Sequence, residues 1–439
     1  MEKAFAIIRL GIKYLYRHRR RYYFLLAAII FGFTIVTFIT STKDGMYNNV
    51  YYSAQSHYAG DIVALGHEYY RNDFIHILGS DEIPTILAAA DQSGINIKHT
   101  VFRTFAITHS APVIHFNGIA AQLRYIMGCD WENEYDLISK MDFEHPVEFS
   151  FGDDGIILSL PVAQQLGVKL GDSVILELDT RFLQKNTATF IVKGIVQDSS
   201  IFGYFKAYVS KLTLNRLILF EDEDCSTIGF FLNNPATAEQ DRFLLQQYLS
   251  SQIQTGELVY DRESLDRERS KRWQGNMVFL YTLPVYLSEI SALLDAMNLL
   301  TYFLYGMMLL TILASAGVTY RLILHERSRE MGVMRSIGFY GKDLRLILLT
   351  EVIILGMISM VIGFFAANLL SWAFSFFSFS WLPGFEIFLK GGKLMALYIP
   401  ATVAINISLL LLVLVLLTFF QSLRVTRKVL PELLSGDPL

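Results

Sequence analysis

Four long runs of apolar residues, at positions 22–42, 296–320, 346–370 and 394–420, dominate the pattern along this 439-residue chain. Three of the runs contain no charged residue, and the run at 346–370 contains only Glu351, near its start. A bilayer is crossed by about 20 mostly apolar residues, and uncharged runs of this length are uncommon in soluble helices. We therefore predict four transmembrane helices; buried helices of a soluble core are the alternative.

The pattern between the first two runs, over residues 43–290, is that of a folded α+β domain. Its clearest part is a short strand at 155–159, after which Ser159 precedes a helix with Pro161 just inside it and Gly167 at its end. Further strands are predicted at 61–65, 95–108, 113–119, 173–178, 189–196, 202–210 and 227–232, and helices at 80–92, 211–219 and 236–252. We predict an integral membrane protein with four transmembrane α-helices and a large extracytoplasmic α+β domain, in two lobes, inserted between helices 1 and 2.

Two segments precede the second apolar run. Residues 261–272 are dense in charges of both signs and are predicted to form a solvated stalk helix. Residues 277–287 are apolar but too few to cross a membrane, and Pro284 interrupts them. We expect this second segment to lie at the outer membrane surface or against the ends of the spans.

Composition and charge support this division of the chain. Hydrophobic residues make up 53% of the sequence and charged residues 18%, which excludes a disordered chain and argues against a purely soluble enzyme. Residues 42–290 hold 19 basic and 32 acidic residues, whereas the rest of the chain holds 18 and 9. A nucleic-acid-binding protein would concentrate basic residues on its soluble part, so nucleic acid is not an expected partner.

Charged residues in the loops indicate the orientation, because loops rich in Lys and Arg stay in the cytoplasm. Residues 1–21, 321–345 and 421–439 together hold sixteen Lys and Arg, whereas residues 371–393 hold two. Both termini and the 321–345 loop are therefore predicted to be cytoplasmic, and residues 43–290 and 371–393 to lie outside the inner membrane. The first span is expected to be a retained anchor, since it is long for a signal peptide and no cleavage-site pattern follows it.

The segment before the first span has a pattern of its own. Within residues 1–21, Arg9, Lys13 and Arg17 recur every four positions among apolar residues. Such a helix lies in the headgroup plane with its basic side toward anionic lipid. We predict a cytoplasmic amphipathic helix bound to membrane lipids; a simple extension of the first span is the alternative.

Motifs of known catalytic or cofactor chemistry are missing from the sequence. The chain has no P-loop, no G-x-G-x-x-G after a strand and no G-x-S-x-G, and its His-Glu pairs lack the second His of a zinc motif. We therefore expect no cofactor, no metal and no enzymatic activity. Cys129 and Cys225 are too few for a disulfide framework; they form either one disulfide or two unrelated buried thiols.

Glu351 is the single acid within a predicted span. An ionisable group inside a membrane is a candidate functional residue. Because Glu351 follows Arg345 by only about one and a half helical turns, it is expected near the cytoplasmic interface. Two interpretations remain open: a structural ion pair with the cytoplasmic basic cluster, or a role in transport or gating.

The cytoplasmic segment 325–344 reads HERSREMGVMRSIGFYGKDL. Charged residues come first, and apolar residues at helical spacing follow. Gly332 and Gly338 interrupt the helical pattern, and glycine destabilises a helix interior by about 1 kcal/mol relative to alanine. Their presence here indicates close backbone contact or a bend. A short amphipathic helix joined rigidly to two spans is suited to docking a partner; an ordinary basic connector is the alternative.

Within this segment, residues 326–338 (ERSREMGVMRSIG) resemble the E-R-x-x-E-[IM]-G-x-x-R-[AS]-[IL]-G signature of FtsX-like ABC-transporter permeases, the MacB and LolC/LolE group. The third run, with Glu351, Gly356 and Gly363, also resembles the third span of that family. Residues 424–434 resemble its terminal R-x-x-R-x-x-x-P-x-E-x-L pattern with the spacing one residue off, and residues 155–178 are similar to a stretch of its extracytoplasmic domain.

The resemblance implies a permease subunit that pairs with a second permease, identical or homologous, and with two copies of a separate ABC ATPase subunit. Six residues would belong to the coupling helix that contacts the ATPase: Glu326, Arg327, Glu330, Gly332, Arg335 and Gly338. The implied function is ATP-driven release or export of lipoproteins or other amphiphilic cargo, with a periplasmic cargo or carrier protein as a further partner. Two related functions remain open: regulation of cell-wall hydrolases, as in FtsX itself, and efflux or peptide export of the MacB type.

Overall fold

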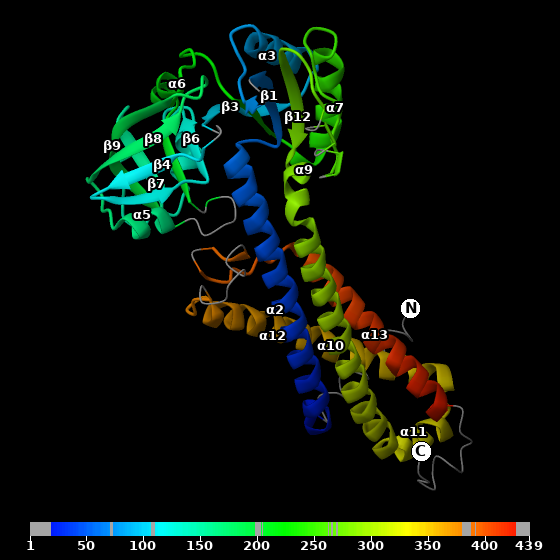
Figure 1. Cartoon of the computed structure of the whole chain (residues 1–439). Helices are drawn as coiled ribbons and strands as arrows, with labels where there is room; N and C mark the ends of the chain where they lie inside the picture. Colours follow the sequence, from blue (N-terminus) through cyan, green and yellow to red (C-terminus); the bar gives the residue numbers. More distant parts are fainter. Residues whose placement is uncertain are drawn as a thin grey trace. The chain divides into compact units, whose positions relative to one another are not determined.

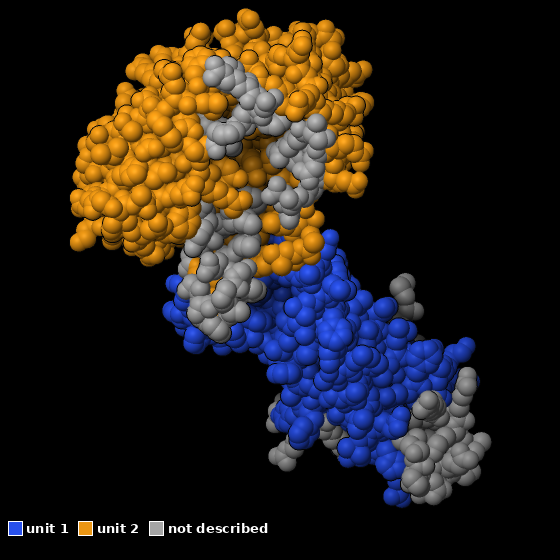
Figure 2. Space-filling view, in the orientation of Figure 1, with its two compact units in different colours: residues 1–47, 294–378, 393–439 blue, residues 48–293, 379–392 orange. Residues whose placement is uncertain are grey.

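The computed structural model describes residues 19–426 apart from 71–72, 107–109, 198–202, 204, 262, 265–266, 269–270, 380–387 and 391. The chain divides into two compact units, coloured separately in Figure 2: a helical unit (Met1–Tyr47, Leu294–Ser378 and Lys393–Leu439) and a sheet unit (Asn48–Leu293 and Phe379–Gly392). The predicted amphipathic helix before residue 19, part of the predicted stalk helix at 261–272 and the terminal pattern beyond residue 426 lie outside the described residues.

Four long apolar helices are the main elements of the helical unit (Figure 1). They are α2 (Arg19–Tyr58), α10 (Ser291–Glu326), α12 (Gly341–Phe374) and α13 (Pro400–Thr426), and the short helix α11 (Ser328–Ser336) follows α10. Each long helix is apolar and long enough to cross a membrane, so the protein is a membrane protein with four candidate spans. Helix α2 has 40 residues, about 60 Å at 1.5 Å per residue, and its residues 48–58 belong to the sheet unit.

The fourth long helix begins later than the apolar run that predicts it. Residues 394–399 are not helical, and α13 starts at Pro400, where the missing N–H of proline costs no helical hydrogen bond. The Leu397 N–H donates instead to the carbonyl of Ser41 in α2, at 2.8 Å. The backbone before α13 is therefore tied to the first long helix.

One apolar core joins the helices of this unit. Four buried side chains spaced three or four residues apart lie on one face of α2, namely Tyr22, Leu25, Ile29 and Phe33, and they share a core with α10, α11, α12 and α13. A Cβ at Gly363 of α12 would lie 3.0 Å from the Phe33 ring, so the absent side chain lets α2 and α12 approach closely. The Asn406 amide of α13 adds a hydrogen bond to the Thr40 hydroxyl of α2, at 2.9 Å.

The sheet unit is built on a twelve-stranded sheet with the order β12-β1-β11-β3-β6-β10-β7-β9-β8-β4-β5 and with β2 paired to β1. The strands are β1 (Ile62–Tyr70), β2 (Asp73–Ile75), β3 (Ile97–Phe105), β4 (Val113–Phe116), β5 (Ile119–Gln122), β6 (Tyr125–Cys129), β7 (Gly155–Ser159), β8 (Ser173–Asp179), β9 (Lys185–Val196), β10 (Lys206–Ser210), β11 (Thr227–Leu232) and β12 (Asn276–Thr282). The helices are α3 (Glu82–Gln92), α4 (Tyr135–Ile138), α5 (Leu160–Leu166), α6 (Lys211–Ile218), α7 (Ala238–Leu249) and α9 (Leu283–Leu287), with 3-10 turns η1 (Pro235–Thr237) and η2 (Ser288–Ile290).

Strand β3 belongs to two groups of strands. Its residues 97–103 pair with β11, whereas residues 104–105 pair with β6. Buried apolar side chains of β1, β11, β12, α3 and α7 form one core, and those of β4 to β10 with α5 and α6 form another. The residues at the end of β3 are therefore close to both groups.

The section from 155 to 167 folds as its local signals predict. Strand β7 is fully buried, Ser159 precedes α5, and Pro161 lies in the first turn of that helix. Gly167 ends the helix with a φ of +70°, a backbone conformation that glycine adopts without steric cost.

The predicted single strand at 113–119 is instead a hairpin of β4 and β5. The chain turns at Asn117 and Gly118, whose φ angles are +46° and +80°. Positive φ at both central residues defines a type I′ turn, which the Asn-Gly pair favours. The signal for this turn is therefore present in the sequence.

The prediction that residues 277–287 lie at the membrane surface or against the spans is wrong. Residues 276–282 form β12, which pairs antiparallel with β1 from Glu68↔Asn276 to Ile62↔Thr282. Pro284 lies in the first turn of α9, where proline is favoured. The apolar character of the segment reflects burial in the sheet unit, since Val278 to Thr282 are all buried.

We predict that Gly229→Ala destabilises the sheet unit by about 2 kcal/mol. A Cβ at Gly229 in β11 would lie 1.8 Å from the carbonyl oxygen of Ala59, so backbone would have to move. The measurement is the midpoint of urea unfolding of the full-length chain in detergent. Gly79→Ala is the control, because its nearest neighbour is the mobile end of the Glu82 side chain, at 3.2 Å; equal midpoints for the two variants would contradict the prediction.

Candidate functional site

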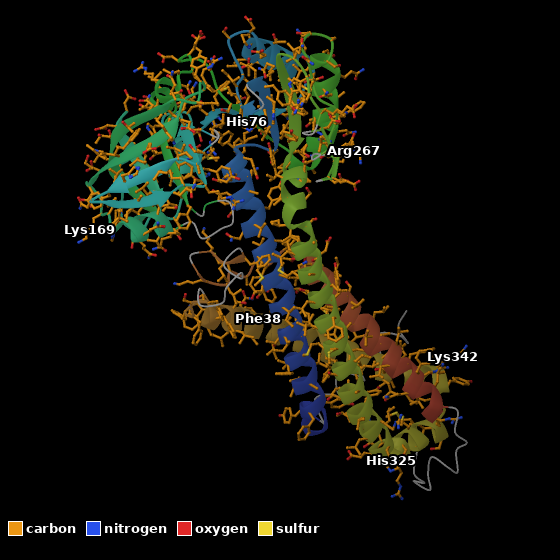
Figure 3. The ribbon with its side chains drawn as sticks, in the orientation of Figure 1. Phe38, His76, Lys169, Arg267, His325 and Lys342 are labelled. Carbon is orange, nitrogen blue, oxygen red and sulfur yellow. The ribbon has the colours of Figure 1, made fainter. Side chains whose placement is uncertain are left out.

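The segment predicted to dock a partner forms helix α11 between α10 and α12. Figure 3 labels His325 near the end of α10 and Lys342 near the start of α12, on either side of it. Met331, Gly332 and Met334 are buried. Gly332 thus lies inside a continuous helix and is buried. Of the two expectations for this glycine, a close backbone contact fits this burial better than a bend does.

Gly338, in contrast, lies where α11 ends. Its φ of +101° is a conformation that favours glycine. The Gly338 N–H donates to the Arg335 carbonyl, and the Phe339 N–H donates to the Met334 carbonyl, both at 3.1 Å. This is the Schellman arrangement of a helix C-terminus, and it fixes the short turn before α12.

Arg327, the second residue of the motif, is buried, with 1% of its surface exposed. Its Nη1 donates to Glu351 Oε2 of α12 at 2.6 Å and to the Tyr22 hydroxyl of α2 at 2.9 Å. The Tyr22 hydroxyl in turn donates to the same Glu351 oxygen, at 2.8 Å. We call Tyr22, Arg327 and Glu351 the polar triad.

The polar triad connects the start of α11 to two of the long helices. Glu351 has no exposed surface, and Tyr22 is also buried. Removing a charge from water costs several kcal/mol unless an opposite charge and hydrogen bonds compensate it, and here the guanidinium and the carboxylate compensate each other. This is the geometry that the first interpretation of Glu351 requires, an ion pair with the cytoplasmic basic cluster.

The other predicted site residues lie nearer to the surface. Glu330 is partly exposed, and its Oε2 lies 3.5 Å from Arg327 Nε, so it extends the polar triad outward. Glu326 and Gly338 are exposed, and Arg335 is partly exposed. The structure therefore brings Arg327 and Glu351 together in the interior and leaves Glu326, Arg335 and Gly338 on the outside.

Sequence reasoning missed two residues of this site, Tyr22 and Tyr340. Tyr22 is one, although it directly follows a basic stretch, where a side chain with an apolar ring and a polar tip is common. Tyr340 is the other, and it is 73% exposed. Val333 and Ile337, two of the apolar residues expected in this segment, are 51% and 71% exposed and are four residues apart, the spacing of one helix face. Tyr340 lies beyond the end of α11, at the start of α12, so helical spacing does not relate it to them.

The two cysteines of the sheet unit form neither a disulfide nor a reactive thiol site. Cys129 and Cys225 are free and buried, so the second of the two interpretations applies, and burial raises the pKa of both thiols to about 12. Such thiols are protonated and unreactive at neutral pH. In the described part of the chain, no group of three or more His, Cys, Asp and Glu side chains could hold a metal ion.

Comparison with known proteins identifies one part of the chain. Residues 302–430 match the family described as FtsX-like permease C-terminal. No curated protein matches the sequence. Among solved structures, the periplasmic region of MacB from Actinobacillus actinomycetemcomitans aligns with a TM-score of 0.32 and 12% identity over 54% of this chain and 95% of that one. A domain of a putative permease from Porphyromonas gingivalis aligns with a TM-score of 0.26 and 10% identity over 42% of this chain and 78% of that one. Scores this low do not establish a shared fold, so the similarity to FtsX-like permeases is that of residues 302–430.

We predict that Arg327→Met or Glu351→Gln alone destabilises the helical unit by about 3 kcal/mol, because each leaves one buried charge unpaired. The double variant Arg327→Met/Glu351→Gln is expected to lose much less stability than the two single variants lose together. The measurement is a double-mutant cycle on the free energy of unfolding of the full-length protein in mixed detergent micelles. Glu330→Gln is the control, with an expected cost below about 1 kcal/mol for a partly exposed partner; additive effects of the two buried substitutions would contradict the prediction.

Proposed function

We propose that this chain, an FtsX-like permease, is the membrane subunit of an ABC transporter driven by two copies of a separate ATPase subunit. The observation that carries the proposal is the polar triad. It links a helix with an exposed apolar surface, α11, to the interior of the membrane helices through Arg327. A partner that moves α11 would thereby move α2 and α12.

The proposed ATPase-binding surface is the outward side of α11 and of the turn after it. Val333, Ile337 and Tyr340 supply an apolar centre. The predicted coupling residues with accessible charged side chains supply a polar rim, namely Glu326, Glu330 and Arg335, and Gly338 forms the exposed turn beside them. An apolar centre within a polar rim is the usual anatomy of a protein–protein interface.

The proposed direction of transmission runs from the cytoplasm outward. Basic residues in the loops support a cytoplasmic α11 and an extracytoplasmic sheet unit. The second permease and membrane lipids would cover the apolar surface of the spans, such as Leu299 and Phe303 of α10, which are exposed in the single chain.

The proposed cargo is a lipoprotein or another amphiphile released from the inner membrane. Glu351 is the single charged residue within the four predicted spans, and its carboxylate is occupied by Arg327 and Tyr22. A route for a charged solute would require further polar groups along the spans. The proposed work is therefore a change in the sheet unit outside the membrane.

We predict that Ile337→Asp abolishes co-purification of the ATPase subunit, because a carboxylate would be buried in the apolar centre of the interface. The side chain is 71% exposed in the single chain, so the thermal stability of the permease alone should be unchanged. Phe243→Asp is the matched control, an apolar residue of α7 that is 56% exposed, and it should leave ATPase binding intact. Retention of the ATPase by the Ile337 variant would refute the docking surface.

We also predict that the orientation can be read from thiol labelling without removing the native cysteines. Cys129 and Cys225 are buried and have pKa values raised to about 12 by burial, so the unmodified protein should not react with an impermeant maleimide at neutral pH. In spheroplasts, Phe243→Cys is expected to react, whereas Ile337→Cys should react only after the membrane is permeabilised. Labelling of both positions from the same side would end the proposed function.

A further inference from the structure

The last turn of α2 is held by an arginine of the sheet. Arg103, in β3, is fully buried, and its Nη1 donates to the carbonyl oxygens of Ser56 at 2.8 Å and His57 at 2.9 Å. Carbonyls in the last turn of a helix have no partner within the helix, and a cation there also interacts favourably with the helix dipole. One guanidinium thus both hydrogen-bonds the free carbonyls and places a positive charge at the C-terminal end of α2.

Glu134 fixes the direction of this guanidinium. Its Oε2 accepts from Arg103 Nε at 2.8 Å and from Nη2 at 2.5 Å, and the carboxylate is fully buried. The planar fork of arginine can bind a carboxylate on one side and carbonyls on the other, whereas the single ammonium of lysine cannot hold both in fixed geometry. The pair therefore sets the position of the α2 carbonyls relative to β3.

Two further contacts hold the same turn. The buried Lys206 of β10 places its Nζ 2.8 Å from His57 Nδ1, and this nitrogen must be unprotonated to accept the hydrogen bond. The Tyr58 ring stacks on Tyr286 of α9, with centroids 3.7 Å apart and planes at 10°. We call Arg103, Glu134, His57 and Lys206 the α2-end joint.

We propose that Arg103 is a positioning residue for transport, through which a displacement of α2 reaches strands β3, β6 and β10. The proposal rests on the proposed function, since it names the residue that couples α2 to the sheet unit. Its basis is the hydrogen bonding of a buried charge to main-chain atoms, which do not rotate away as side chains do. Loosening this contact would let the end of α2 move without the sheet.

Arg242 offers a matched control within the same unit. It is also fully buried and paired with a glutamate, Glu239, at 2.6 Å, and it also donates to a main-chain carbonyl, that of Val259. None of these partners belongs to α2. Arg103→Met and Arg242→Met therefore both remove a buried guanidinium, and only the first is expected to release α2. Glu239 is 48% exposed whereas Glu134 is fully buried, so Arg103→Lys, which keeps a positive charge beside Glu134, is compared as well.

The experiment uses the full-length permease bound to its ATPase in lipid nanodiscs. Hydrogen–deuterium exchange is compared with and without a non-hydrolysable ATP analogue, for the wild type, Arg103→Met, Arg103→Lys and Arg242→Met. We expect the wild type and Arg242→Met to show nucleotide-dependent exchange in β3, β6 and β10. This difference should be at least halved in both Arg103 variants, while ATPase binding and the ATP hydrolysis rate are unchanged.

Each of the other outcomes overturns the proposal. If both Arg103→Lys and Arg103→Met show the full nucleotide-dependent change in exchange, Arg103 does not couple α2 to these strands. If Arg242→Met loses this change to the same extent, the effect of the Arg103 variants is only a general destabilisation of the sheet. If Arg103→Met does not fold, the exchange measured for Arg103→Lys alone decides whether Arg103 has the coupling role. A wild type that binds the ATPase but shows no response in these strands also overturns the inference, whereas a wild type that does not bind the ATPase overturns the proposed function itself.

Discussion

One buried charge, the guanidinium of Arg327, constrains how the helices of the helical unit can be arranged. An unpaired cation in an apolar core costs several kcal/mol, so Glu351 and Tyr22 must stay within hydrogen-bond distance of it. Apolar contacts, such as that of Phe33 with Gly363, permit small sliding movements because dispersion forces have little direction. The polar triad is therefore a charged fixed point among these contacts, beside neutral hydrogen bonds such as that of Asn406 with Thr40, and it lies where the outward-facing helix α11 begins.

Helix α2 has such a fixed point near each end. Its first described turns carry Tyr22, which bonds to Arg327, and its last turn offers the Ser56 and His57 carbonyls to Arg103. Between these contacts the helix is uninterrupted, and its backbone hydrogen bonds run along the axis and resist stretching. On the proposed function, a helix with these properties transfers displacement more directly than one held only by apolar packing, because neither end can slip past its partner.

The spans and much of the sheet unit were predictable because their signals are local. Apolar runs indicate the four long helices, and Ser159, Pro161 and Gly167 mark the bounds of α5 within a few residues. The site was less predictable, because Tyr22 and Arg327 are 305 residues apart in the sequence and no periodicity relates them. The prediction for residues 277–287 was wrong for the same reason, because their burial comes from pairing with β1, a strand more than 200 residues earlier. The role of Gly332 stayed open between a close contact and a bend, because a glycine in a helical pattern is compatible with both and only its burial in the folded chain separates them.

The two sides of α11 serve different requirements, and this separation follows from the burial of its residues. Arg327 and Met331 face inward, where size and charge must satisfy a closed set of neighbours. Ile337 and Tyr340 are 71% and 73% exposed, although Tyr340 also caps α12 through Asp343, so much of their surface is available to a partner. On the proposed function, recognition of a partner can change by substitution on the outward side without disturbing the polar triad, while the transfer of movement depends on the inward side. A permease working as proposed would keep one mechanical linkage and adapt its docking surface independently.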